Sequence, residues 1–404
     1  MKLNLLAARI LCALLTAFTA LSASAYDFEV DGIYYKINSS TDKTVAVTYK
    51  NNGNAGNYND ADTYSGIVVI PSSVNHDGNI YSVNKIGTHA FAQAPALTQV
   101  NLPETITSIE RDAFYECSNL TEVNIPNGIT EIAKNTFFAC KSIKEISIPE
   151  SVTSIGESAF WECDALTNIA LPESLAEINQ FAFAYCISLE TITIPANVKK
   201  LGGWSFARSG LKNIELHEGL EIIGEAAFTF CEQLMSVKIP DSVTTIEDAA
   251  FSACSSLESV EIGTGIKTIG ASNFVLCDAL KSITIHALEP PMAKEVTSDD
   301  IIEENSANGT FTKNHYENVL LTVPVNSLPK YKDVNKEYGT AVWPNFKYYT
   351  NDALTAIEGV EAAEGAESEV VARYDLSGRP VADDYRGMTI VRRADGSTAK
   401  EILR

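Results

Sequence analysis

Seven cysteines recur through the middle of the chain at a fixed spacing. They lie 23 residues apart, with one double interval of 45, and are Cys117, Cys140, Cys163, Cys186, Cys231, Cys254 and Cys277. Cysteines could form disulfides, hold a soft metal ion or carry out redox chemistry. Seven is odd, no histidine accompanies them, and Ala94 and Ser209 fill the same place in two further units. Stacked Cβ vectors would also suit disulfide geometry poorly. We therefore expect a ladder of buried free thiols, with redox or metal binding as the alternatives.

Other residues of catalytic type lack the spacing of a site. Five histidines are scattered along the chain: His76, His89, His217, His286 and His315. No G-x-S-x-G, H-E-x-x-H or phosphate-binding loop is present. A loop with Asn57, Asn59, Asp60 and Asp62 could bind Ca²⁺ through oxygen ligands, but a polar turn explains it as well. The sequence predicts no catalytic residues, no metal ion and no cofactor.

The cysteines belong to a repeated unit, and each follows a phenylalanine by three residues. Nine units share one register, set by Phe91, Phe114, Phe137, Phe160, Phe183, Phe206, Phe228, Phe251 and Phe274. Every interval is 23 residues except the one from Phe206 to Phe228, which is 22 because a turn residue near Gly210 is missing. A fixed period in this range is the signature of a solenoid.

Within a unit, alternation of apolar and polar residues predicts short strands, as in Leu120–Ile125, which Pro126 ends. A Phe and a Cys three residues apart predict one helical turn with both side chains inward. A single coil cannot bury its apolar side, whereas stacked coils bury it continuously. We predict an α/β repeat solenoid of nine coils over residues 71–286.

Two outward surfaces are candidates for binding. The strand face carries small and polar residues between its buried positions, among them Asn124, Ser147, Thr193, Glu215 and Lys238. The turn after each Phe carries Tyr115, Phe138 and Trp161 in three successive units, with Tyr185 one place further on. Aromatic side chains can anchor an interface or stack on sugars. They could equally pack against neighbouring turns as an outer layer of the core.

The charge of the chain excludes some partners. The 404 residues carry a formal net charge of −22 at pH 7. Such an acidic surface argues against binding to nucleic acid or to anionic membranes. It also serves simply to keep an elongated molecule soluble.

The ends of the chain differ from the repeats. Residues 1–25 have a basic start, an apolar run and Ala23-Ser24-Ala25, which is typical of a secretory signal peptide. No other stretch is long and apolar enough to cross a membrane, so we expect an exported protein without a transmembrane segment in its mature form. Residues 26–70 predict a β-rich N-terminal cap with a hairpin at Asp31-Gly32.

The C-terminal part predicts three segments. Glu289-Pro290-Pro291 is expected to stop the last coil, and residues 287–350 to form a cap with a mobile polar loop, a strand at 319–324 and apolar bulk from Trp343 and Phe346. Residues 351–369 are an acidic linker, and 370–404 a small β-rich module.

The unit I/L-P-x-S-V-T-x-I-G-x-x-A-F-x-x-C-x-x-L-x-x-I resembles the BspA-type bacterial leucine-rich repeat family over roughly residues 70–286. This resemblance implies a leucine-rich repeat array, and binding to host matrix proteins as in some members. The tail, with Tyr374, Leu376, Gly378, Gly387 and Gly396, is similar to C-terminal sorting modules of the type IX secretion route. That similarity implies export and, often, attachment to the cell surface.

Three functions remain open at this stage. The first is a secreted or cell-surface binding protein, either an adhesin or a protein-interaction scaffold. The second is a glycan-capture protein that uses the aromatic row. The third is a carbohydrate-active enzyme on a parallel β-helix, which would need clustered acids that the repeats do not show.

Overall fold

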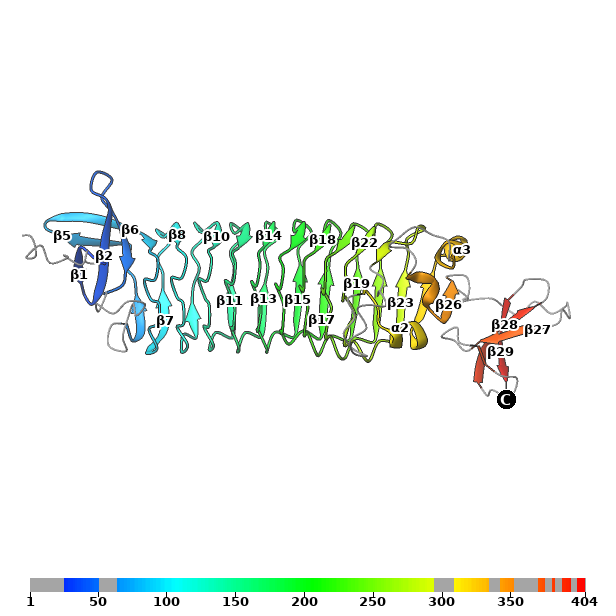
Figure 1. Cartoon of the computed structure of the whole chain (residues 1–404). Helices are drawn as coiled ribbons and strands as arrows, with labels where there is room; N and C mark the ends of the chain where they lie inside the picture. The colour runs from blue at the N-terminus through cyan, green and yellow to red at the C-terminus, as the bar shows by residue number, and fades with distance from the viewer. Residues whose placement is uncertain are drawn as a thin grey trace, which may run out of the picture.

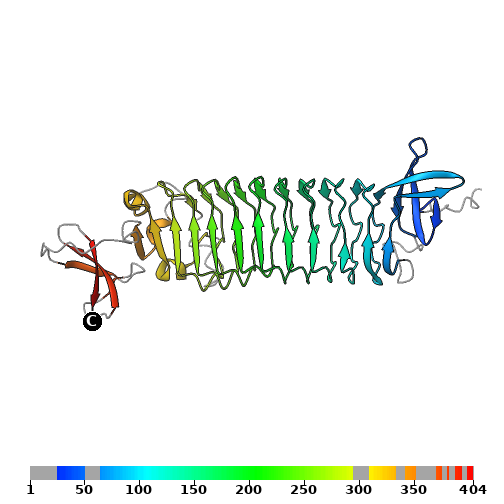
Figure 2. The same cartoon turned by 180° about the vertical axis from the view of Figure 1, so that it is seen from behind.

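The computed structural model describes residues 25–50, 64–293, 309–333, 342–351, 370–374, 380–381, 387–393 and 398–403. Its centre is a straight rod of stacked coils (Figures 1 and 2). We number the coils by the ladder phenylalanine, from coil 1 with Phe91 to coil 9 with Phe274. The signal peptide, the Asn57–Asp62 cluster, the polar loop after residue 293 and the acidic linker lie outside the described residues, except for Ala25.

Parallel strands form two opposite faces of the rod. One face is an eight-stranded sheet of two-residue strands: β10 (Glu131–Ile132), β12 (Ser154–Ile155), β14 (Glu177–Ile178), β16 (Lys200–Leu201), β18 (Ile222–Ile223), β20 (Thr245–Ile246), β22 (Thr268–Ile269) and β24 (Met292–Ala293). Each strand has one buried residue, so the sheet places one apolar group per coil in the core. We call this the short-strand face.

The opposite face carries the longer strands, and we call it the long-strand face. Its strands are β4 (Gly66–Val69), β7 (Leu97–Asn101), β9 (Glu122–Val123), β11 (Glu145–Ser147), β13 (Asn168–Ala170), β15 (Thr191–Ile194), β17 (Asn213–Leu216), β19 (Ser236–Ile239), β21 (Ser259–Ile262), β23 (Ser282–Ile285), β25 (Leu320–Val323) and β26 (Tyr348–Asn351). Buried and exposed residues alternate along β15 and β19, as the period of two predicts.

The core between the faces is a ladder of phenylalanines. All nine predicted rings are fully buried, and neighbouring centroids lie 5.1–6.2 Å apart in near-parallel planes. The prediction of a repeat solenoid with about nine stacked coils is confirmed. The stack continues past Pro291, however, because β24 pairs with β22 and Phe311 stacks on Phe274 at 5.5 Å. The two prolines therefore do not stop it.

The predicted helical turn in each coil is wrong. The segment around each Phe is a series of tight turns, such as the bond from the Tyr115 backbone N–H to the Asp112 carbonyl. Two residues per coil, two places before and two places after the Phe, have positive φ, for example Asp112 and Glu116 at 58°. An α-helix cannot contain them. Backbone N–H groups in this segment bond to the next coil instead, as Phe114 does to Thr136.

The short coil is accommodated at one glycine. The register changes from 23 to 22 residues between coils 5 and 6, where Thr191 pairs with Asn213. A Cβ at Gly210 would lie 2.2 Å from the carbonyl oxygen of Ile187. Only glycine lets the shortened turn approach the preceding coil this closely.

Small β structures stand at both ends. At the N-terminal end, β1 (Phe28–Val30), β2 (Ile33–Ser39), β3 (Thr44–Thr48), β5 (Ser73–His76) and β6 (Asn79–Ile86) form a sheet that joins the solenoid through the pairing of β6 with β8 (Ser108–Ile109). Beyond Phe311 come α2 (Lys313–Asn318), η2 (Val325–Ser327), α3 (Leu328–Tyr331) and η3 (Trp343–Asn345). In the tail, β27 (Val370–Tyr374), β28 (Gly387–Arg393) and β29 (Thr398–Leu403) pair antiparallel.

Candidate interaction surfaces

The long-strand face brings its five candidate residues into columns. Asn124 directly follows β9, and Ser147, Thr193, Glu215 and Lys238 lie on β11, β15, β17 and β19; all five side chains are exposed. The parallel register places Thr193 directly beside Glu215, and the Thr193 hydroxyl donates to the Glu215 carboxylate at 3.2 Å. An open groove of about 480 Å³ runs over strands β13, β15 and β17. Both polar and apolar residues line this groove.

Some of these side chains serve the solenoid itself. The Asn124 amide accepts from the Leu102 N–H at 2.7 Å and donates to the Leu102 carbonyl at 2.8 Å, so it continues the ladder where β9 is short. Lys238 forms an ion pair with Glu261 at 2.9 Å, and this contact lowers the pKa of the Glu261 carboxyl. The Asn124 amide is thus engaged within the solenoid, and the Thr193 hydroxyl is bonded to Glu215, its neighbour on the next strand.

The aromatic residues after the Phe form a second column, which we call the aromatic row. Tyr115, Phe138 and Trp161 stack across coils 2–4 with centroids 4.9 and 5.9 Å apart, and Tyr185 follows at 5.2 Å from Trp161. All four are half-buried. Neighbouring rings stack on one another's faces, and each side chain keeps part of its surface exposed. The row thus packs as an outer layer, one of the two roles that the sequence left open.

Sequence reasoning missed three residues that extend the row. Phe181 lies 4.9 Å from Trp161 and 6.1 Å from Trp204, and the Arg208 guanidinium lies 4.3 Å above the Phe230 ring. Phe181, Trp204 and Arg208 occupy the positive-φ positions two residues from the ladder Phe. In the helical turn that the sequence predicted, these positions would not have lain on the same side of the coil as the aromatic row. Their regular offset from Phe183 and Phe206 was the available signal.

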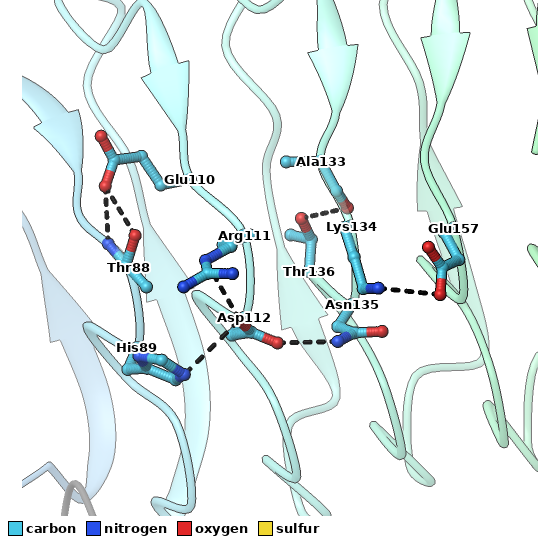
Figure 3. Close-up of polar contacts among 10 residues, drawn as sticks. All are labelled: Thr88, His89, Glu110, Arg111, Asp112, Ala133, Lys134, Asn135, Thr136 and Glu157. Carbon is cyan, nitrogen blue, oxygen red and sulfur yellow. Dashed lines mark hydrogen bonds and ion pairs between the residues drawn. The ribbon is translucent and has the colours of Figure 1, made fainter.

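A row of polar side chains links the turns of the first coils (Figure 3). His89 Nε2 lies 3.4 Å from Asp112, which accepts at 2.9 Å from the Asn135 amide. Burial lowers the pKa of His89, against the opposing effect of Asp112. The nearby Thr88 hydroxyl donates to Glu110, and the Thr136 hydroxyl to the Ala133 carbonyl. Both hydroxyls thus donate to acceptors other than the imidazole.

The seven cysteines of the ladder lie inside the rod. All are fully buried, and none is in a disulfide. Each thiol donates to the carbonyl of the ladder Phe in the preceding coil at 2.9–3.2 Å. Ser209, which stands in the same place in coil 6, contacts the Cys231 sulfur at 3.3 Å. The position thus requires a small side chain and favours one that can donate a hydrogen bond.

Membrane-spanning helices and clustered metal ligands are both absent from the described residues. Within those ranges, no helix has the length and hydropathy needed to cross a membrane. In the same part of the chain, no group of three or more His, Cys, Asp and Glu side chains could hold a metal ion.

The fold defines a leucine-rich repeat β-solenoid, and comparison with known families identifies which kind. The model of the BspA type leucine rich repeat region matches residues 84–212 and 200–290, which together span just over half of the chain. The chain belongs to this family. No curated protein matches it.

Three solved structures of leucine-rich repeat and related surface proteins are similar to this chain. A leucine-rich repeat protein from Bacteroides ovatus is 28% identical, with a TM-score of 0.51 over 66% of this chain and 73% of that one. A leucine rich cell surface protein from Faecalibacterium prausnitzii is 22% identical, with a TM-score of 0.32 over 65% and 96%. The pneumococcal vaccine antigen PcpA is 20% identical, with a TM-score of 0.42 over 76% and 95%.

Proposed function

We propose that the protein is an exported, non-enzymatic binding protein of the cell surface, which acts as an adhesin or a protein-interaction scaffold. The observation that carries this proposal is the long-strand face, where the parallel register places Ser147 beside Ala170 and Thr193 beside Glu215, all four of them exposed. A rigid row of polar side chains suits an extended protein partner. Leucine-rich repeat proteins generally bind proteins, which agrees with this role.

Export and attachment are parts of the same proposal. The apolar leader with Ala23-Ser24-Ala25 supports secretion, and the resemblance of the tail to type IX sorting modules supports delivery to the surface. Host extracellular-matrix proteins are the partners that the family resemblance favours. Fractionation of the producing cells should place the chain at the surface or in the medium, and a cytoplasmic chain that retains its leader would contradict export.

Binding itself is tested with the purified protein on immobilised extracellular-matrix proteins. Saturable binding to at least one of them is the expected result. The matched variant Thr193→Lys places a cation beside Glu215 on the long-strand face, and Thr153→Lys makes the same change at an exposed position next to β12 on the opposite face. We expect the first variant to bind several-fold more weakly and the second to bind normally. A folded sample that binds no protein on the panel would refute the proposal.

A further inference from the structure

The aromatic row changes its pattern at coils 5 and 6. In coils 2–4 the position after the ladder Phe is aromatic, but in the next two coils it is Ala184 and Ala207. In those same two coils the flanking positions, two residues before and after the Phe, become large. The result is a short trough, which we call the coil 5–6 trough, lined by Trp161, Phe181, Ala184, Tyr185, Trp204, Ala207 and Arg208.

We propose that the coil 5–6 trough is a docking pocket for one apolar side chain, aromatic or aliphatic, that lies beside a carboxylate in an extended segment of a partner protein. This inference rests on the proposed binding function and assigns it a second site. The long-strand face would hold the partner along its length, whereas the trough would take a single anchoring side chain.

The walls of the trough are rigid. Trp161 closes one end, and it contacts Phe181 at 4.9 Å on one side and Tyr185 at 5.2 Å on the other. Trp204 continues the Phe181 wall at 6.1 Å and is 37% exposed, so part of this indole is open to a ligand. The floor consists of two buried alanines. The trough has a volume of about 190 Å³, which suits one large side chain better than a drug-sized ligand.

Arg208 supplies the charge preference. Its guanidinium lies 5.7 Å from the centroid of the Tyr185 ring and 4.3 Å from that of the Phe230 ring, which places the group against both rings at the rim of the trough. The described residues include no carboxylate in an ion pair with Arg208. Arg208 is exposed, and Glu232 lines the neighbouring hollow with it without forming an ion pair. Bidentate contact with a carboxylate is what an exposed guanidinium favours. A cationic ligand would be repelled.

The lining favours a peptide side chain over a sugar. A sugar needs several directed polar partners, yet no carboxylate or side-chain amide lines the trough. The Trp161 Nε1 is already bonded to Glu162 at 3.3 Å. Phe138 and Tyr185 also stack on Trp161, which leaves no open indole face there for a pyranose ring.

The test uses the purified protein and short capped peptides that carry Phe-Asp, Phe-Asn, Phe-Lys or Ala-Asp between glycines. Two of the three tryptophans line the trough and the third, Trp343, is fully buried, so intrinsic fluorescence reports on the site. We expect the Phe-Asp peptide to bind at least fivefold more tightly than Phe-Asn, and more tightly still than Phe-Lys or Ala-Asp. Arg208→Gln should abolish the preference for Asp over Asn.

A filling variant gives the decisive control. Ala207→Tyr places in the floor the side chain that Tyr115 carries at the same position of coil 2, so the coil should fold normally. Ser252→Tyr makes the same addition in coil 8, outside the trough. We expect Ala207→Tyr to lose Phe-Asp binding at least tenfold and Ser252→Tyr to retain it.

Three outcomes would overturn the pocket: equal Phe-Asp binding by both variants, no peptide response at millimolar concentration, or binding of a neutral and acidic oligosaccharide panel instead. The two proposals fail in distinguishable ways. If the protein binds the matrix panel but Ala207→Tyr does not change peptide response, only the pocket is wrong. If no protein on the panel binds, the proposed binding function itself is refuted.

Discussion

At the residue scale, the buried cysteines show how one position can serve every coil. Each is small enough for the ladder and also donates a weak S–H bond to a Phe carbonyl of the coil before it. Burial raises the pKa of Cys117 to about 12, so the reactive thiolate is nearly absent at neutral pH. The ladder is therefore chemically inert while the rod is folded.

This inertness predicts the reactivity of the thiols. In a native sample at pH 8, we expect Cys117 to react with an aromatic disulfide reagent about a thousandfold more slowly than free cysteine, because its pKa lies about three units above the ordinary value of 9.0. The other six thiols are also fully buried, so the reagent should not reach them in the native rod. All seven should react at once in concentrated guanidinium. Rapid labelling of the native protein, or disulfides between ladder cysteines in non-reducing mass spectrometry, would contradict the burial of free thiols.

At the element scale, the repeat register predicted most of the coil. The spacing of Phe137, Phe160 and Phe183 placed their rings in one stack, and the alternation of apolar residues placed the strands. The backbone of the turns could not be read in the same way. Residues such as Ala139 and Ala226 adopt positive φ only because interlocking bonds to the next coil hold them there, and no local propensity indicates that conformation.

The same limit hid the coil 5–6 trough and the extra coil. Trp204 and Arg208 flank the ladder only if the turn is not helical, so their grouping with Trp161 follows from the tertiary structure. Phe311 stacks on Phe274 but does not follow it at the 23-residue spacing, so the repeat period alone could not place its ring in the stack. A fixed period predicts those coils that keep it and misses a coil that is interrupted.

Substitutions at two adjacent aromatic residues distinguish the contribution of the core to stability from that of the outer aromatic row. Phe160 is fully buried between Phe137 and Phe183, so Phe160→Ala should reduce the free energy of unfolding by about 3–5 kcal/mol. Trp161 is half-buried, and Trp161→Ala should cost less than half as much. Denaturant unfolding followed by circular dichroism measures both. Equal losses would mean that the aromatic row belongs to the core.

At the scale of the whole molecule, the two ends of a stack of coils would expose the core unless other groups cover them. At the N-terminal end, Tyr64 lies 4.8 Å from Phe91, and its hydroxyl donates to the Thr48 carbonyl. At the other end, Trp343 and Phe346 pack edge-on against Phe311 at 5.3 and 5.0 Å. Aromatic groups thus cover the last ring on both sides, and the caps keep water from the Phe ladder.

A histidine with a lowered pKa lies near each end of the rod. His89 is in coil 1, and His315 lies in α2 of the C-terminal cap, where its ring accepts from or donates to Thr312 at 3.1 Å. Burial lowers the pKa of both below the ordinary value of 6.5. Below pH 6.5 the unfolded chain takes up protons that the native chain does not, so stability must fall as the pH falls through this window.

We therefore expect the ends of the rod to open first on acidification, before its centre. Between pH 6.5 and 5, amide exchange should accelerate around coil 1 and α2 while coils 4–6 stay protected, because their thiols and phenylalanines do not titrate in this range. His315→Asn retains a hydrogen-bonding side chain but no imidazole and should reduce the acid response of the C-terminal cap. His217→Asn, at an exposed position, should not. Uniform acceleration along the whole rod, or an unchanged acid response in His315→Asn, would show that the ends are not the acid-sensitive part.

Below pH 4.5 a second loss of stability is expected, since Lys85 and Thr88 hold the pKa of the Glu110 carboxyl below its ordinary value despite burial.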